Sequence, residues 1–241
     1  MLVGLILTVL VLFFALGLPA LLEYFQPPKE PPKNVKSRYI TIPPQIDGAR
    51  EQLWLTNASI VEPVLELSGS IMYSDSNKGT KMYIMNTNTT LYLGIFLPNK
   101  IYPISSILND FFLYCDANFD GNMDQDDVKV VDLNDRTYKD CWTDIVGSIA
   151  YFYQDTNSNG QIAYNHTNAI EGMKGDYFFE IALPLNTTLS DSSELNVTRG
   201  DFVILAINGY ISLGSGKAYY INWPFHNDIF NVATFGNITL A

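Results

Sequence analysis

Short apolar runs separated by turn residues are the feature that most restricts the fold of this chain. The runs recur at residues 82–87, 90–97, 110–116, 128–133, 148–154, 176–185, 201–209, 218–223 and 235–240. They are rich in β-branched and aromatic residues, and turn-forming residues occupy nearly every gap between them. About nine short strands without long amphipathic helices between them favour an all-β, jelly-roll-like, two-sheet sandwich over an α/β fold.

The run TLYLGIFL, residues 90–97, indicates where one sheet is covered. Its aliphatic residues at positions 91, 93, 95 and 97 lie on one face, and Tyr92 and Phe96 lie on the other. A strand that is apolar on both faces is typical of the centre of a sheet covered on both sides. We therefore expect this strand in the middle of its sheet.

The N-terminus differs from the rest of the chain. Residues 1–22 are uncharged and almost wholly apolar, and at about 1.5 Å per residue they could cross a hydrocarbon core of roughly 30 Å. We interpret residues 1–25 as a transmembrane anchor, with a cleaved signal helix as the alternative. Residues 26–38, QPPKEPPKNVKSR, predict an extended spacer, and residues 39–241 are long enough for one folded domain.

Residues 116–127, DANFDGNMDQDD, hold five carboxylates in twelve positions. Such a run repels itself unless a cation neutralises it. Oxygen donors stand at every position that calcium loops use, and Gly121 stands at the sharp turn, so the pattern resembles the loops of EF-hands and dockerin-like modules. Strand-like runs flank it, which predicts a calcium loop between two strands; a solvated acidic turn is the alternative. The expected ligands are Asp116, Asn118, Asp120, the carbonyl of Asn122, Asp124 and Asp127.

A partial copy of this pattern occurs at residues 155–162, DTNSNGQI. Asp155, Asn157, Asn159 and the carbonyl of Gln161 match its first half, and the match then fails. A loop with one carboxylate would bind calcium weakly, so an Asn-Gly turn is the preferred interpretation and a second metal site is the alternative.

Cys115 and Cys141 are the only cysteines. In an oxidising compartment they could form one disulfide, with two buried thiols as the alternative. A bridge would close the excursion of residues 116–140 and would contribute roughly 3 kcal/mol on the chain-entropy model.

Several features place the folded domain outside the cell. A calcium site of millimolar affinity suits the extracellular space, as does a disulfide. The lysines of the spacer argue for the cytoplasm, but we give them less weight than the glycosylation sequons. These sequons begin at Asn57, Asn88, Asn165, Asn186, Asn196 and Asn237.

The charge of the chain limits its partners. Lys plus Arg is 14 and Asp plus Glu is 25, which gives a formal net charge of −11. This charge opposes binding to phosphate backbones and to anionic lipid surfaces, so nucleic acid is not an expected partner.

Separated stretches of the chain together resemble one family. They are IPPQIDGAREQLWLTNA (42–58), TNTTLYLGIFLP (87–98), DFFLYCDANFDG (110–121), DYFFEIALPL (176–185) and ATFGNITL (233–240). The Ile-Asp-Gly followed by Trp54, the strand sequences and the closing glycine are similar to those of family 9 carbohydrate-binding modules and DOMON-like domains. The resemblance covers nearly all of residues 40–241. It implies a jelly-roll β-sandwich with structural calcium.

The resemblance leaves the ligand open. Sugar-binding members of the family hold glycans between exposed tryptophans. Here Trp54 belongs to the family signature and is expected in the core, which makes Trp142 and Trp223 the candidates for ligand contact. No unmistakable clamp of two tryptophans is evident.

Other relatives hold haem b between a methionine and a histidine or lysine. The candidates in this chain are Met82, Met85, Met173, His166 and His226. His166 lies within a sequon and His226 follows an apolar turn, which favours ordinary surface or core histidines.

Catalysis is poorly supported. The chain has no GxSxG, HExxH or P-loop motif, and its two histidines offer few general bases. The leading hypothesis is a non-enzymatic, membrane-anchored, extracellular and calcium-stabilised module that binds glycan or another surface component. The alternative is a structural subunit of a filament or surface layer, self-assembled by strand addition. A haem-binding electron-transfer domain comes third.

Overall fold

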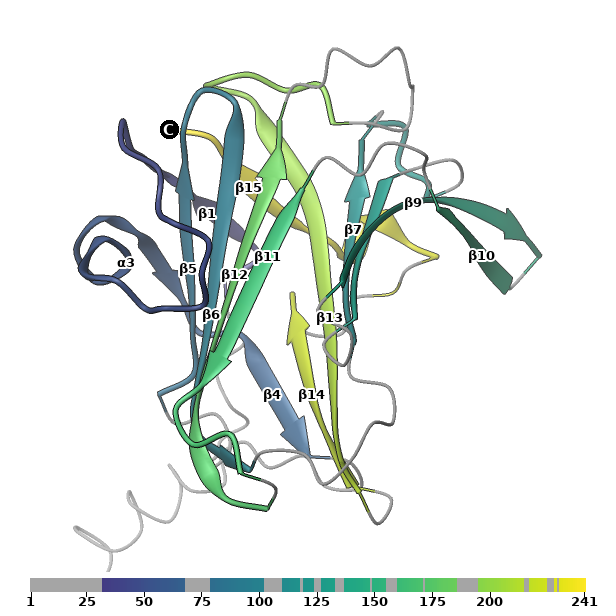
Figure 1. Cartoon of the computed structure of the whole chain (residues 1–241). Helices are drawn as coiled ribbons and strands as arrows, with labels where there is room; N and C mark the ends of the chain where they lie inside the picture. The colour runs from purple at the N-terminus through teal and green to yellow at the C-terminus, as the bar shows by residue number, and fades with distance from the viewer. Residues whose placement is uncertain are drawn as a thin grey trace, which may run out of the picture.

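The chain folds into a β-sandwich of two sheets, as predicted (Figure 1). The computed structural model describes residues 32–67, 79–101, 110–117, 119–123, 127–132, 137–147, 149–154, 160–170, 172–185, 195–214, 217–224, 228 and 230–241. The expected anchor, residues 1–25, lies outside the described residues. Within the described ranges no helix has the length and apolarity needed to span a membrane.

The larger sheet has nine strands in the described part of the chain and runs β1-β15-β13-β7-β8-β9-β10, with β14 paired to β13 and β4 paired to β14. All of its pairs are antiparallel except β1 with β15. Its strands are β1 (Asn34–Lys36), β4 (Val64–Leu67), β7 (Asp110–Asp116), β8 (Asp127–Asp132), β9 (Thr137–Val146), β10 (Ile149–Gln154), β13 (Phe202–Gly214), β14 (Lys217–Trp223) and β15 (Gly236–Thr239).

The smaller sheet has six strands among the described residues, in the order β11-β12-β6-β5-β2, with β3 on β5. A short helix, α3 (Gln52–Asn57), precedes β3, and a 3-10 turn, η2 (Val232–Thr234), precedes β15. The strands of the smaller sheet are β2 (Arg38–Tyr39), β3 (Ser59–Val61), β5 (Lys81–Asn86), β6 (Thr90–Ile101), β11 (Gln161–His166) and β12 (Lys174–Pro184).

The strand β6 confirms the prediction that it is covered on both faces. Leu91, Leu93 and Ile95 lie in the core between the two sheets. Tyr92 lies in a second cluster on the opposite face, with Trp54 from α3. Figure 1 shows α3 on the side of the smaller sheet that faces away from the larger one. The helix therefore covers the outer face that alternation in residues 90–97 predicts.

A buried carboxylate holds this helix and the loop before it. The Oε1 atom of Glu180 accepts a hydrogen bond from Trp54 Nε1 at 2.7 Å, and Oε2 accepts from the main-chain nitrogens of Asp47 at 2.9 Å and Gly48 at 2.5 Å. Gly48 has φ +85°, and an added Cβ would lie 2.6 Å from the carbonyl carbon of Tyr164, so a side chain at this position would be strained. The Ile-Asp-Gly and Trp signature thus supplies the hydrogen-bond donors that hold the loop and α3 against Glu180 of β12.

The N-terminal boundary of the domain lies earlier than predicted. Residues 34–39, which fall mainly in the expected spacer, form β1 and β2 and pair with β15 and β5. The hydroxyl of Ser37 is buried and donates to Asn86 Oδ1 at 2.6 Å. Because these strands are held by main-chain pairing and contribute little apolar surface, alternation in the sequence does not reveal them.

Candidate functional site

The outer face of the larger sheet carries aromatic side chains as well as polar ones. Along β7, Phe111 and Leu113 point into the core between the sheets, so Phe112 and Tyr114 point outward. The outward residues form a third apolar cluster, and Val232 and Phe235 from the η2 segment cover one end of it.

Three aromatic rings meet on this face. Phe112 and Tyr114 lie nearly parallel, with centroids 6.0 Å apart and an interplanar angle of 14°. Phe152 reaches over from β10, with its centroid 5.8 Å from Phe112 and 6.3 Å from Tyr114. Phe112 is half-buried and Phe152 is exposed. Burial raises the pKa of the Tyr114 hydroxyl well above its ordinary value.

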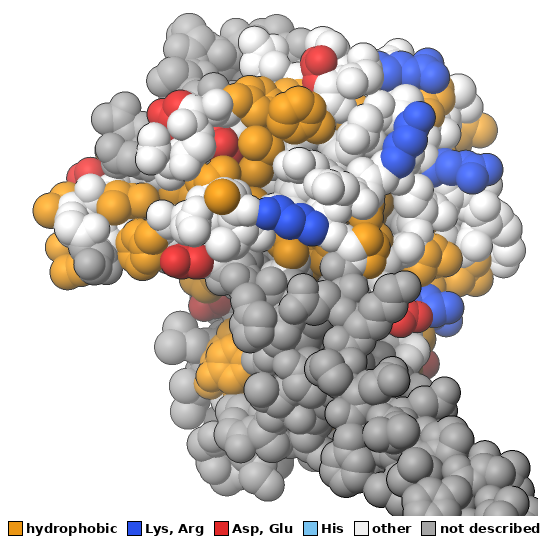
Figure 2. All heavy atoms as spheres, turned by 180° about the vertical axis from the view of Figure 1, so that it is seen from behind, with side chains coloured by type: hydrophobic (Ala, Val, Ile, Leu, Met, Phe, Trp, Pro, Cys, Tyr) orange, Lys and Arg blue, Asp and Glu red, His pale blue; other side chains and the backbone are white. Residues whose placement is uncertain are grey.

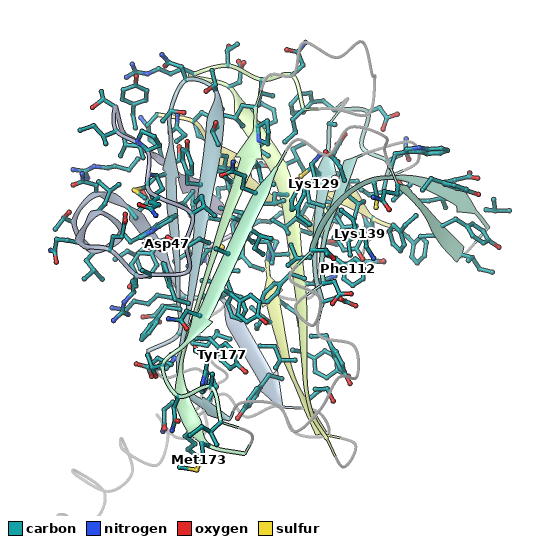
Figure 3. The ribbon with its side chains drawn as sticks, in the orientation of Figure 1. Asp47, Phe112, Lys129, Lys139, Met173 and Tyr177 are labelled. Carbon is teal, nitrogen blue, oxygen red and sulfur yellow. The ribbon has the colours of Figure 1, made fainter. Side chains whose placement is uncertain are left out.

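Polar side chains lie in the same row as Phe112. The strand registers place Asn222, Asn208, Phe112, Val130 and Lys139 opposite one another across five neighbouring strands. Every member of the row is half-buried. Figure 3 shows Phe112 and Lys139 close together on this part of the molecule. We call these five residues together with Phe152 the outer-face site.

One amide oxygen of the outer-face site is unsatisfied. Asn208 Oδ1 is buried and has no hydrogen-bond partner among the described residues. A buried polar atom without a partner costs about 1–3 kcal/mol, so a side-chain movement that exposed Oδ1 to a hydrogen-bond donor would be favourable.

A second row of outward side chains borders the site. Tyr220, Tyr210, Asp110 and Asp132 stand opposite one another on successive strands. The two tyrosines meet edge to face with centroids 5.2 Å apart. Burial, and then the neighbouring Asp132, raise the pKa of the Asp110 carboxyl, against the lowering effect of Lys139. The whole face thus combines flat apolar rings with amide, ammonium, hydroxyl and carboxyl groups, which suits a ligand with C–H faces and hydroxyl groups.

The tryptophans predicted to contact a ligand lie elsewhere. Trp223 is fully buried, donates to the carbonyl of Pro32 at 3.2 Å and cannot reach a ligand, so this prediction is wrong. Trp142 is half-buried and stacks on Tyr153 with centroids 4.6 Å apart. Strand alternation puts this pair on the face of the ribbon opposite Phe152, so Trp142 does not join the outer-face site.

The acidic loop joins β7 to β8, as the sequence predicts. Asp116 is buried at the end of β7, and its Oδ2 atom accepts from the main-chain nitrogen of Gly121 at 3.2 Å. Its Oδ1 atom is buried and has no hydrogen-bond partner in the described ranges. Burial raises the pKa of the Asp116 carboxyl, although main-chain amides led by those of Gly121 and Phe119 lower it.

Other parts of the loop are partly described. The main-chain nitrogen of Asn122 donates to Asp120 Oδ1 at 2.8 Å, and the Thr143 hydroxyl donates to the carbonyl of Met123. The predicted ligands Asn118 and Asp124 and the side chain of Asp127 lie outside the described residues. Within the part of the chain that is described, no group of three His, Cys, Asp or Glu residues could hold a metal. The calcium loop therefore stays a prediction.

No disulfide joins Cys115 and Cys141, which corrects the prediction of a bridge. Cys115 pairs with Asp127 on β8, and Cys141 pairs with Val128 on the other side of β8. An intervening strand separates the cysteines by about twice the strand spacing of 4.8 Å, beyond the reach of a disulfide. Cys115 also belongs to the core between the sheets and Cys141 to the outer cluster. The alternative, two buried thiols, is the arrangement observed.

The remaining candidates are dispersed. The residues of the second metal loop are only partly described: Gln161 begins β11 with an exposed side chain, and outside the described residues lie Asp155, Asn157 and Asn159.

The haem candidates also lie apart. His226 lies outside the described residues. His166 is buried, with Nε2 3.1 Å from the carbonyl of Lys100 and its ring against Tyr177. Met82 and Met85 lie in different clusters on opposite faces of β5, and Met173 is exposed. The structure does not bring these methionines and His166 together as a haem pocket.

The sequon asparagines lie mostly at the surface. Asn57, Asn88, Asn165 and Asn196 are exposed, and Asn237 on β15 is half-buried. Asn186 lies outside the described residues. Their glycosylation stays a prediction.

The sequence did not reveal the outer-face site. The consecutive aromatic residues Phe111 and Phe112 indicate that one ring of the pair points outward, and this is the one available signal. The neighbours of Phe112 depend on the registers of four strand pairs, which alternation within one strand does not specify.

Comparisons with known proteins bear on the fold. No family model matches the chain, and no curated protein matches it. Two solved structures of a family 9 carbohydrate-binding module from Caldicellulosiruptor kristjanssonii are similar to it. The complex with glucose has a TM-score of 0.57 at 15% identity, over 86% of this chain and 95% of the module. The complex with cellotriose has a TM-score of 0.54 at 16% identity, over 86% and 93%. The chain therefore has the β-sandwich fold seen in family 9 carbohydrate-binding modules.

Proposed function

We propose that this protein is a non-catalytic carbohydrate-binding module and that glycan binds at the outer-face site. The row of half-buried amide, aromatic and ammonium side chains at Asn222, Asn208, Phe112 and Lys139 is the observation that carries the proposal. An aromatic ring can pack on the C–H face of a pyranose, while amide and ammonium groups bond to its hydroxyls. The family 9 module with the same fold is solved with glucose and with cellotriose.

The dimensions of the row suit an oligosaccharide. From Asn222 on β14 to Lys139 on β9 the row crosses four gaps between strands, which is about 19 Å at a strand spacing of about 4.8 Å. A half-buried row of this length can contact several consecutive sugar rings. Phe152 would close one side of the site.

We expect Phe112→Ala to lower glycan affinity at least tenfold, because the substitution removes the central ring of the site. Asn208→Ala should weaken binding severalfold, since it removes an amide that would bond to a sugar hydroxyl. A glycan array would identify a bound sugar, and isothermal titration calorimetry with that sugar would then measure the variants.

Ile42→Ala and Asn165→Ala are controls, because both side chains are exposed and lie outside the larger sheet that carries the site. They should bind as tightly as the wild type. A wild type that binds no glycan on the array, or a Phe112→Ala variant with unchanged affinity, would contradict the proposal.

Calcium at the acidic loop is a further part of the proposed function. Its support is the buried Oδ1 atom of Asp116, which has no hydrogen-bond partner among the described residues. The chain also turns sharply there, since Phe119 and Gly121 have φ of 61° and 82°. An oxygen-seeking cation fits this carboxylate. The ion would tie together the ends of β7 and β8, the strands that carry Phe112 and Val130.

We also propose that residues 1–25 hold the domain on the outer surface of a membrane. Support comes from the apolar N-terminus and from the exposed sequon asparagines. Intact cells treated with a protease should lose the domain while a cytoplasmic marker survives. A domain that stays intact until the cells are lysed would contradict this placement.

A further inference from the structure

The strands β9 and β10 form a ribbon that projects from the body of the sandwich (Figure 1). The order of the larger sheet ends at β10, and β9 is its pairing partner. Among the described residues no strand lies on the other edge of β10. Since antiparallel neighbours bond only alternate residues to each other, the remaining amide and carbonyl groups of β10 point toward this open edge.

The open edge lacks the usual protection against pairing. Natural edge strands carry charges, prolines or bulges that block association, but β10 reads IAYFYQ and has none of these. Its side chains are exposed on both faces, except for the half-buried Ala150. Val146 and Ile149 at the tip are 60% and 57% exposed, and Tyr151 is 45% exposed. Figure 2 shows apolar side chains gathered on the projecting ribbon, at the left of that view.

We propose that β10 pairs in antiparallel fashion with β10 of a second copy of this chain. An antiparallel pair of identical strands is self-complementary about a two-fold axis, so both copies use the same surface. The charge of the strand also allows this pairing. The chain carries a net charge of −11, but β10 itself is uncharged, so the two paired edges do not bring like charges into contact.

The apolar area fits a dimer of modest stability. Exposed large side chains of the ribbon are Val146, Ile149, Tyr151, Phe152 and Tyr153. Their exposed parts amount to roughly 500 Å² per copy. Pairing at the edge buries only the part of this area that faces the partner strand, so the contact lies below about 1,000 Å² in total, in the range of weak interfaces. The new main-chain hydrogen bonds add to this contact.

Pairing would also place two outer faces side by side. A two-fold axis between antiparallel strands runs perpendicular to the sheet, so the outer face of each copy lies on the same side of one continuous sheet. This consequence rests on the proposed function, whereas the pairing does not. Two glycan sites on one surface would raise the affinity for a multivalent surface without new contacts.

The test uses the full chain in mild detergent, with sedimentation velocity across two orders of magnitude of concentration. Tyr151 is central in β10, so we expect Tyr151→Glu and Tyr151→Lys each to sediment as one chain, because like charges then face each other. The wild type should sediment as two chains. A mixture of the two variants should recover a dimer, since the introduced charges attract.

Ile42→Glu is the control. It changes an apolar residue that is 73% exposed and lies outside the ribbon, so this variant should stay dimeric.

Thermal unfolding by circular dichroism verifies that each variant is folded, and Ile149→Glu replaces Tyr151→Glu if that variant is not. A wild type that sediments as one chain at the highest concentration overturns the proposal. A dimer that survives both Tyr151 variants also overturns it, because the contact then lies elsewhere, and so does a mixture that stays monomeric. A failure of glycan binding would leave these results unchanged.

Discussion

Replacing Glu180 by glutamine is expected to lower the free energy of unfolding by about 3 kcal/mol. Both carboxylate oxygens of Glu180 accept hydrogen bonds, from Trp54 on one side and from the nitrogens of Asp47 and Gly48 on the other. An amide group would present N–H to one of these donors, and the Glu180 side chain is fully buried. Urea denaturation of the variant and the wild type measures the difference.

A control and a mutant cycle separate this mechanism from a general loss of charge. Glu62→Gln changes an exposed carboxylate and should leave the free energy of unfolding within about 0.5 kcal/mol of the wild type. Trp54→Phe removes the indole donor, so Glu180→Gln should cost less in that background, with a coupling energy of about 1 kcal/mol. Additive effects of the two substitutions would refute the proposed contact, as would a Glu180→Gln variant as stable as the wild type.

Calcium is expected to raise the melting temperature of the wild type by several degrees, and Asp116→Asn should abolish that rise. Extracellular calcium modules bind with Kd of about 0.1 to 1 mM, so about 10 mM calcium would stabilise the fold by about 1.4 to 2.7 kcal/mol. For a domain of about 200 residues this corresponds to a shift of about 3 to 10 °C. Differential scanning calorimetry with calcium, with magnesium and with chelator measures it.

The same substitution should have the opposite effect without calcium. Asp116 buries a carboxylate oxygen that has no hydrogen-bond partner in the described part of the chain, and a neutral amide costs less to bury than a charge. In chelator, Asp116→Asn should therefore be at least as stable as the wild type. Asp144→Asn, on β9 and outside the loop, should keep the full calcium response. A melting temperature that is identical with calcium and with chelator would exclude the calcium loop.

The sequence predicted those parts of the fold that depend on alternation and local pattern. The two apolar faces of residues 90–97 placed β6 within a covered sheet, as the two clusters around it confirm. The family signature placed Trp54 in the core, where it is fully buried. The strands on either side of the acidic loop followed from the apolar runs that flank it.

Features that depend on the pairing of distant strands could not be predicted. The supposed bridge failed because β8 lies between the strands of Cys115 and Cys141. The burial of Trp223 could not be predicted, because it depends on a contact with a distant residue. The indole packs against Gly236, where an added Cβ would lie 2.4 Å from the ring. Phe112, Asn208 and Lys139 are far apart in sequence and meet only through the registers of β13, β7, β8 and β9.

The parallel pairing of β1 with β15 has a mechanical consequence. Asn34, Val35 and Lys36 lie in register with Asn237, Ile238 and Thr239, and the next residue, Ser37, receives a hydrogen bond from the nitrogen of Ala241 at 3.2 Å. A pull on the polypeptide ahead of Asn34 along the axis of β1 would load the hydrogen bonds between β1 and β15 together in shear, instead of opening them one after another. Under such a load, the N-terminal end of the sandwich would yield only when all of these bonds break at once.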